Sequence, residues 1–188
     1  MNKNFIISTN HQKVLSLFVK FSDLEFYERE VSRKIEISTG SSNKVLNDLF
    51  SNGFLIRRRE GKMYFYQIDN NHPEFKYFKI LNNIDLLVSL VQKLKKITKR
   101  IILYGSCSNG SDTSKSDIDL FIISEKRREV LQIINSYSLR KPFENIKIQP
   151  VIQNSLDLLE SKKSDKEFLS LVRQGIILWE HSIDESRL

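Results

Sequence analysis

The sequence predicts an α/β protein, of the α+β kind, that is built in two parts. In the first seventy residues, three segments with apolar residues at helical spacing precede two strand-prone runs that flank Gly61. From residue 97 onward, apolar strand-prone runs alternate with amphipathic helical segments. We therefore expect one domain over residues 1–70 and another over 97–188, joined by a helix over 71–96.

The composition is that of a soluble globular protein with a basic surface. Of the 188 residues, 40% are hydrophobic and 28% are charged, and the net charge of +7 favours an anionic partner. The single cysteine, Cys107, excludes an intramolecular disulfide, and the three scattered histidines lack the spacing of a zinc site. No apolar run approaches the ~20 residues of a transmembrane helix, and the N-terminus lacks the features of a signal peptide. We expect a cytoplasmic protein without membrane contact.

The elements of the first part follow from local patterns. The third predicted helix ends at Gly53, which can adopt the left-handed conformation that stops a helix. A hairpin is predicted around Gly61, between two β-prone runs. The full set of expected elements is helices over 11–21, 26–35 and 43–53, a small polar turn over 36–42, and strands over 54–60 and 62–68.

Three helices followed by a hairpin resemble the winged helix-turn-helix of bacterial and archaeal transcription regulators. The resemblance implies that the third helix enters the major groove of duplex DNA while the hairpin, or wing, contacts phosphates. The residues expected at the groove are Ser41, Ser42, Asn43, Lys44 and Asn47. The residues expected on phosphates are Arg57, Arg58, Arg59 and Lys62. A winged helix used for protein contact or dimerisation stays open as the alternative.

A change of composition marks the connection between the two parts. Pro73 cannot continue a strand ladder, and apolar residues from Leu81 to Leu94 then recur at helical spacing. We expect a helix here that joins the domains, and a homodimer interface along it stays open. A basic cluster follows at Lys93, Lys95, Lys96, Lys99 and Arg100, just before the segment that carries the chemistry.

That segment, LYGSCSNGSDTSKSDIDLFI over residues 103–122, combines a Gly-Ser turn with two aspartates in an apolar strand. Because side chains alternate along a strand, Asp117 and Asp119 are expected on one face. Two like charges side by side repel, and carboxylate oxygens are ligands that suit Mg²⁺. Gly105 lets a polyphosphate approach the backbone, and Ser106 offers a hydroxyl and an amide N–H. The pattern predicts a magnesium-bound nucleoside triphosphate at this turn.

The same segment is similar to the signature of the nucleotidyltransferase superfamily that includes DNA polymerase beta. The matching positions are Gly105, Ser106, Gly110, Ser116, Asp117 and Asp119. The resemblance spans residues 97–179 and implies a short mixed sheet with helices on one side. It also implies that Asp117 and Asp119 are catalytic and hold Mg²⁺, that the turn and Ser116 bind nucleotide, and that ATP or another nucleoside triphosphate is the ligand.

One departure from the family pattern concerns a third acidic residue, which transferring members usually carry on the third strand. Here that strand contains Gln149 and Gln153 but no acid, and Glu144 lies just outside it. A third carboxylate helps to hold the ion that activates the attacking hydroxyl. Its absence favours slow or absent transfer. Cys107, beside the turn, receives no role.

Two functions of different class therefore stay open. The first is an enzyme that transfers a nucleoside monophosphate from a triphosphate to a hydroxyl on a protein, nucleic acid or small molecule. The second is a DNA-binding regulator or antitoxin-like protein whose nucleotidyltransferase domain binds nucleotide without efficient catalysis, with a toxin as a further partner. The intact Gly-Ser and Asp-x-Asp pattern favours the first, and the missing third acid favours the second.

Overall fold

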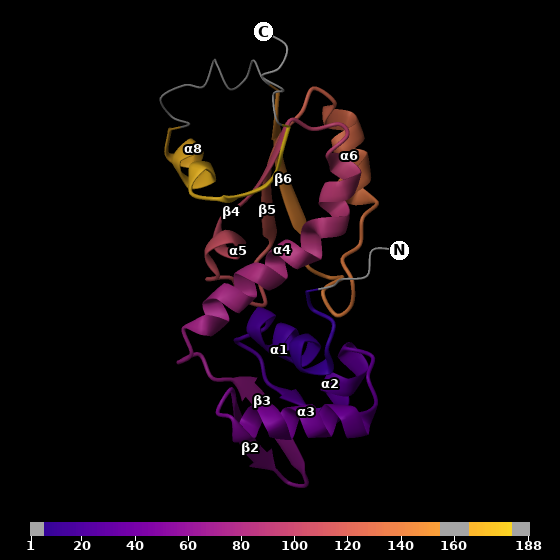
Figure 1. Cartoon of the computed structure of the whole chain (residues 1–188), viewed down its shortest axis with the longest axis vertical. Coiled ribbons are helices and arrows are strands. Elements are labelled where there is room, and N and C mark those ends of the chain that lie inside the picture. The colour runs from indigo at the N-terminus through magenta and orange to yellow at the C-terminus, as the bar shows by residue number, and fades with distance from the viewer. Residues whose placement is uncertain (1–5, 155–165, 182–188) are drawn as a thin grey trace.

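The computed structural model describes residues 6–154 and 166–181, which form two lobes stacked along the long axis of the molecule (Figure 1). A single long helix, α4 (Glu74–Leu94), runs from one lobe into the other. Among the described residues, none of the helices combines the length and the apolar character that crossing a membrane would need.

The N-terminal lobe has the fold of a winged helix-turn-helix. Its three strands form an antiparallel sheet in the order β1-β3-β2, and the β2–β3 hairpin is the wing. Its apolar core includes Leu17, Phe18 and Leu46, none of which is exposed. The elements, in chain order, are α1 (Asn10–Lys20), β1 (Phe26–Tyr27), α2 (Glu28–Lys34), α3 (Thr39–Ser51), β2 (Leu55–Glu60) and β3 (Met63–Ile68).

Two expected boundaries in this lobe were wrong. Phe26 belongs to the short strand β1 and pairs with Tyr66 of the wing, so α2 begins after it. The expected polar turn is partly the first turn of α3, because the Ser38 side chain caps that helix by accepting a hydrogen bond from Ser41 N at 3.1 Å. The helix therefore begins earlier than expected, at Thr39, because small polar residues follow the capping serine. Gly53 does follow the helix with a φ of 77°.

The C-terminal lobe is built on a four-stranded mixed sheet in the order β6-β5-β4-β7. Strands β5 and β6 are parallel, whereas β4 is antiparallel to both β5 and β7. The elements after α4 are β4 (Arg100–Tyr104), α5 (Ser106–Asn109), β5 (Ile118–Ile123), α6 (Arg127–Asn135), β6 (Ile148–Gln153), α8 (Lys166–Arg173) and β7 (Ile176–Glu180). The sequence also predicts a helical segment over residues 155–175, of which residues 155–165 lie outside the described residues.

Helices flank the sheet on both faces, not on one side as the resemblance implied. Alternate residues of β5 point to opposite faces. Ile118, Leu120 and Ile122 pack into the main core with α4 and α6. Phe121 faces the other way and packs with Val172 of α8. The difference arises because α8 carries its own apolar stripe, which covers the second face of the sheet (Figure 1).

Helix α4 is a structural part of the C-terminal lobe and more than a connection. Leu86, Leu87, Leu90 and Leu94 are buried in the main core beneath the sheet, while the N-terminal half of α4 packs on α1. Leu81, counted in the expected apolar stripe, is 37% exposed. The stripe that is buried is therefore shifted around the helix toward the sheet.

Candidate functional site

The Gly-Ser turn follows β4 and lies against the second aspartate of the motif. Gly105 has a φ of 71°, a conformation that favours glycine. A Cβ at this position would lie 2.7 Å from Asp119 Oδ2, which is closer than van der Waals contact allows. Gly105 is therefore required for two reasons, and the turn backbone and the Asp119 carboxylate are brought together as the sequence pattern predicted.

The two aspartates lie at the start of β5. Asp117 precedes the strand, and Asp119 is its second residue, paired with Tyr104 of β4 and with Gln149 of β6. Burial raises the pKa of the Asp119 carboxyl above its ordinary value, and the charge of Asp117 raises it further. Burial also raises the pKa of Tyr104, with Asp119 adding to the effect. Negative charge is concentrated here, which favours a bound cation.

Gln149 lies on β6, the strand on which the resemblance implies a third acid. Its Nε2 donates a hydrogen bond to Asp117 Oδ2 at 3.3 Å, and its Cα is the partner of Asp119 in the parallel register. Glu144 is exposed and lines, together with Gln149, a cavity of about 250 Å³ beside β6. Over residues 6–154 and 166–181, no three His, Cys, Asp or Glu side chains are grouped so that they could hold a metal ion. The site thus has two carboxylates and one amide.

Gly110 and Ser116, both expected to contact nucleotide, have local structural contacts. Gly110 ends α5 with a φ of 76°, and a Cβ there would lie 2.8 Å from the carbonyl oxygen of Lys76 in α4. Ser116 Oγ accepts a hydrogen bond from Thr113 N at 3.0 Å, and Ser116 N donates to Thr113 O at 3.1 Å. Gly110 thus permits close packing on α4, and Ser116 closes the turn that leads into Asp117.

Two residues beside the turn were not assigned a role from the sequence. Cys107 is buried, and burial raises the pKa of its thiol to about 11, so the thiol is protonated at neutral pH. Tyr104 contacts Phe168 of α8 edge to face, with ring centroids 5.6 Å apart, and shares a sheet face with Asp119. The strand alternation that places Asp119 also places Tyr104, once the antiparallel pairing of β4 with β5 is known.

The expected groove residues all lie in α3, but one of them is buried. Asn43 and Lys44 are exposed, and Asn43 Oδ1 accepts a hydrogen bond from Asn47 Nδ2 at 2.6 Å. Ser41 is partly exposed next to the capping Ser38. Ser42 is fully buried and its hydroxyl donates to the carbonyl of Glu28 at 3.3 Å. The expectation that Ser42 faces a groove is therefore wrong, because this position packs α3 against α2.

The three arginines of the wing have different environments. Arg57 is half-buried between the rings of Phe50 and Tyr64, with its Cζ 4.1 and 4.4 Å from the two centroids. Arg58 is held by two carboxylates, those of Glu25 at 2.7 Å and Glu60 at 2.5 Å, which raise its pKa.

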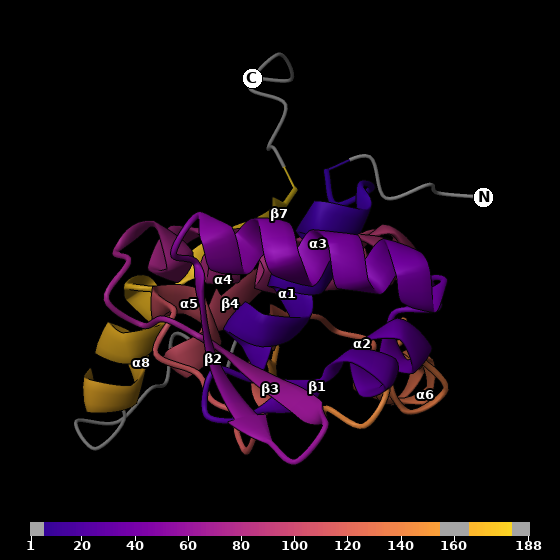
Figure 2. The ribbon, with the colours of Figure 1, turned by 90° about the horizontal axis from the view of Figure 1, so that it is seen from below.

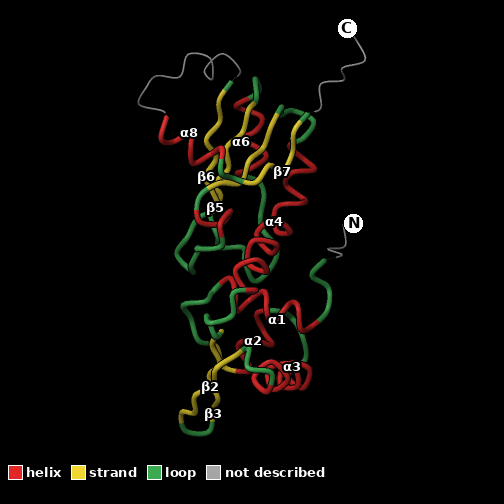
Figure 3. The backbone as a smooth tube through the Cα atoms, turned by 60° about the vertical axis from the view of Figure 1, so that its left-hand side comes forward, coloured by secondary structure: helices red, strands yellow, loops and turns green. Residues whose placement is uncertain are grey.

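Arg59 and Lys62 are exposed, as is Arg58, and Arg59 Nε donates to the Gly61 carbonyl at 3.0 Å. The wing and α3 lie together at the end of the molecule that is farthest from the four-stranded sheet (Figures 2 and 3). Both are candidate elements for contact with duplex DNA.

The C-terminal lobe thus combines a short mixed sheet, a Gly-Ser turn after its first strand, and two aspartates at the start of the next strand. This combination defines a nucleotidyltransferase fold. Residues 85–184 match the family described as Polymerase beta, Nucleotidyltransferase, which is more than half of the chain, and the chain belongs to that family. The match begins within α4, in agreement with the burial of that helix in the core.

Two solved structures share features with the chain at low similarity. Reduced HlyU from Vibrio cholerae N16961 is 22% identical over 44% of this chain and 75% of its own, with a TM-score of 0.30. TrmBL2, an archaeal chromatin protein with a novel mode of DNA binding, is 14% identical over 87% of this chain and 71% of its own, with a TM-score of 0.31. At these scores neither carries an argument about function. A comparison with curated proteins finds no match.

Proposed function

We propose that this protein binds a magnesium-bound nucleoside triphosphate in its C-terminal lobe and duplex DNA through its winged helix, and that it transfers nucleotide slowly or not at all. It would act as a DNA-binding regulator that responds to nucleotide. The observation that carries this proposal is the Gln149 amide, hydrogen-bonded to Asp117 at the position of a third carboxylate. The observation favours binding over efficient chemistry.

The residues at the turn fit one magnesium ion. Asp117 and Asp119 supply carboxylate oxygens, and burial, together with the charge of Asp117, raises the pKa of the Asp119 carboxyl, so that a cation would stabilise its ionised form. When bound, the ion would neutralise the charge of the triphosphate. The backbone N–H groups at Gly105 and Ser106 would donate to phosphate oxygens, because both residues are partly exposed and Gly105 has no side chain.

Efficient transfer needs more than this set provides. A second ion that activates the attacking hydroxyl is usually held by a further carboxylate. The amide of Gln149 carries no charge, and it presents an N–H donor to Asp117. The site therefore supports binding and orientation of a triphosphate better than deprotonation of an acceptor.

Binding of ATP in the presence of MgCl₂ tests the nucleotide site. Isothermal titration calorimetry should detect it for the wild type and not for the Asp117→Asn, Asp119→Asn double variant. Circular dichroism of that variant controls for folding, and Glu129→Gln on the surface of α6 is a matched charge control. Equal magnesium-dependent affinity in the double variant would refute the site.

A DNA-binding role is supported by the exposed Asn43 and Lys44 on α3 and by Arg59 and Lys62 on the wing. Phosphate contacts from such residues give affinity that depends strongly on salt. Fluorescence anisotropy with a labelled 30-base-pair duplex at low and at moderate salt tests this. A protein that binds no duplex even at low salt would instead have a winged helix for protein contact.

The second candidate is a true nucleotidyltransferase, with a hydroxyl of a protein, nucleic acid or small molecule as acceptor. It is favoured by family membership and by the close approach of Gly105 to Asp119. Incubation with ATP labelled at the α-phosphate and MgCl₂ would reveal it as label transferred to an acceptor. Rapid transfer by the wild type would identify this candidate as the function, with a substrate group or Glu144 completing the site.

A further inference from the structure

A buried polar network links the two lobes next to the candidate nucleotide site. Lys20, the last residue of α1, forms an ion pair of 2.7 Å with Asp112, and neither side chain is exposed to solvent. Asn83 of α4 completes the arrangement, accepting from Lys20 Nζ at 2.9 Å and donating to Asp112 Oδ1 at 3.1 Å. Because an unpaired buried charge is costly, this pair fixes the relative position of its partners.

The same network extends to the backbone before the aspartate pair. Lys79 Nζ donates to the carbonyl of Asp112 at 2.8 Å and to Ser22 Oγ at 3.1 Å. Cys107 lies 3.6 Å from Lys20 Nζ, and its thiol donates to the carbonyl oxygen of Asp117 at 3.4 Å. A chain of contacts therefore runs from the winged-helix lobe to the first aspartate of the candidate site.

A second contact holds the same loop from the solvent side. Asp23, which follows α1, accepts hydrogen bonds from Ser114 N at 2.9 Å and from Ser114 Oγ at 2.5 Å. Residues 111–116, here called the inter-lobe loop, are thus held by Lys20 from within and by Asp23 from outside. The loop ends at Ser116, directly before Asp117, so its position sets the position of that carboxylate.

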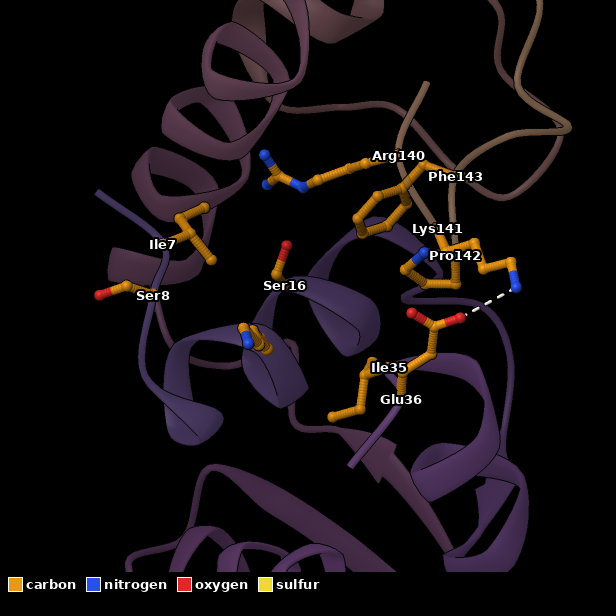
Figure 4. A pocket seen from close by; sticks show the side chains of 10 residues that line it. Ile7, Ser8, Ser16, Ile35, Glu36, Arg140, Lys141, Pro142 and Phe143 are labelled. Atoms are coloured by element: carbon orange, nitrogen blue, oxygen red, sulfur yellow. Dashed lines mark hydrogen bonds and ion pairs between the residues drawn. The ribbon is translucent and has the colours of Figure 1, made fainter. Parts of the chain in front are cut away.

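Away from this network, the boundary between the lobes is less tightly packed. A cavity of about 420 Å³ lies on one side of it, lined by Ile7 and Ser16 from the N-terminal lobe and by Arg140 and Phe143 from the other (Figure 4). A second cavity, of about 480 Å³, borders the inter-lobe loop itself and is lined by Ser111 together with Ser22 and Lys79. The inter-lobe loop is held by several polar contacts between the lobes. It is therefore a better connection between the candidate nucleotide site and the candidate DNA-contacting elements than the boundary around the first cavity.

We propose that the inter-lobe loop couples the two binding sites, so that a bound magnesium–nucleoside triphosphate strengthens the binding of duplex DNA. Lys20 and Asp23 are then positioning residues through which the winged-helix lobe helps to build the nucleotide site. This inference rests on the proposed function. The physical basis is that the loop contacts Lys20 and Asp23 of the winged-helix lobe and leads directly into Asp117, so a ligand that favours this arrangement of the loop at one site also favours it at the other, and the second ligand binds more tightly.

The coupling is measured as the ratio of DNA affinities with and without MgATP. Anisotropy titrations of the full chain with a labelled 30-base-pair duplex, in MgCl₂ alone and in MgCl₂ with ATP, should show a gain of about fivefold or more for the wild type. Calorimetry should show that DNA tightens ATP binding by the same factor, because linkage is reciprocal.

Variants of the exposed contact identify the loop as the connection without disturbing the buried ion pair. Asp23→Ala and Ser114→Ala should each bring the ratio to within about twofold of one, and the double variant should match the single ones, because both changes remove one interaction. Lys141→Ala is the matched control. It breaks an exposed ion pair of 2.9 Å between the lobes, with Glu36, that does not involve the loop, and it should leave the ratio unchanged.

The outcomes separate this inference from the proposed function. If ATP and DNA each bind but the ratio is one or lower, the coupling is refuted while the proposed function stands. A ratio that falls equally in Lys141→Ala would refute the loop as the connection. If either ligand fails to bind, the proposed function fails and the coupling fails with it.

Discussion

At the scale of single residues, the ionised form of the Asp119 carboxyl is destabilised in the metal-free protein. Its pKa is raised by burial and by the neighbouring charge of Asp117. The folded protein thus binds this proton more tightly than the unfolded chain does. Stability is accordingly lost as the pH rises from the ordinary value of 3.8 through the raised folded value.

A neutral residue at this position should therefore stabilise the metal-free protein at neutral pH. For Asp119→Asn we expect a higher free energy of unfolding than for the wild type at pH 7 in EDTA, measured by urea denaturation. The advantage should shrink as the pH falls through the raised pKa of Asp119 and be smallest below about pH 4, where the carboxyl is protonated in the folded and in the unfolded chain. The surface change Glu129→Gln should have little effect. A variant less stable than the wild type at pH 7 would show that Asp119 is stabilised by contacts in the folded state.

Gln149 offers a gain-of-function experiment at the same site. Gln149→Glu adds a carboxylate beside Asp117, and we expect the affinity for Mg²⁺ to rise about tenfold, since ligand charge tunes the affinity of oxygen sites. Transfer from labelled ATP should increase as well if an acceptor is supplied. Gln132→Glu, the same change on the exposed face of α6, should alter neither quantity. Unchanged magnesium affinity in Gln149→Glu would mean that this side chain does not face the ion.

At the scale of elements, the wing arginines differ in their contacts, and we expect them to contribute differently to folding and to the proposed binding of DNA. Arg57 stacks between Phe50 and Tyr64, and Arg57→Ala should lower the free energy of unfolding by about 1–2 kcal/mol, the range for a partly desolvated cation–π contact. Arg59→Ala should change it by less than about 0.5 kcal/mol, as is usual for an exposed position. Equal losses in thermal or urea unfolding would argue against the stacked role of Arg57.

For the affinity for DNA, we expect the exposed Arg59 to have the larger effect. Arg59→Ala should reduce the slope of log affinity against log salt by about one unit, as expected for one lost phosphate contact. Arg58→Ala should reduce it by less, because Glu25 and Glu60 already neutralise this guanidinium. Anisotropy titrations between 50 and 200 mM salt (roughly the range used for such slopes) provide the measurement. If Arg58→Ala has the larger effect, Arg58 must leave its carboxylates on binding.

At the scale of the whole molecule, the buried pair of Lys20 and Asp112 holds the lobes in one arrangement. Lys20→Met leaves Asp112 buried without its cation, and we expect a loss of about 3–5 kcal/mol in the free energy of unfolding. Asp112→Asn should also be destabilising. The double variant should lose less than the sum of the two, because a contact is removed only once. Additive losses in this cycle would show that the two side chains act independently.

The sequence by itself determined the elements and the spacing within them. Apolar periodicity placed the helices and the wing, and strand alternation, together with the Gly-Ser turn, brought Gly105, Asp117 and Asp119 to one end of the sheet. These features depend on residues close together in the chain, whose relative directions follow from backbone geometry. For the same reason Gln149 could be singled out, since its place on the third strand follows from counting along that strand.

Only the tertiary structure decided which side chains are buried and which charges are paired. Ser42 has the same local pattern as Ser41 but packs against α2, and Arg58 resembles Arg59 until Glu25, 33 residues earlier, is brought beside it. Lys20 and Asp112 lie 92 residues apart and meet only because α1 packs on α4. Burial and ion pairing depend on contacts between distant segments, whereas periodicity depends on neighbours, so no local pattern could specify them.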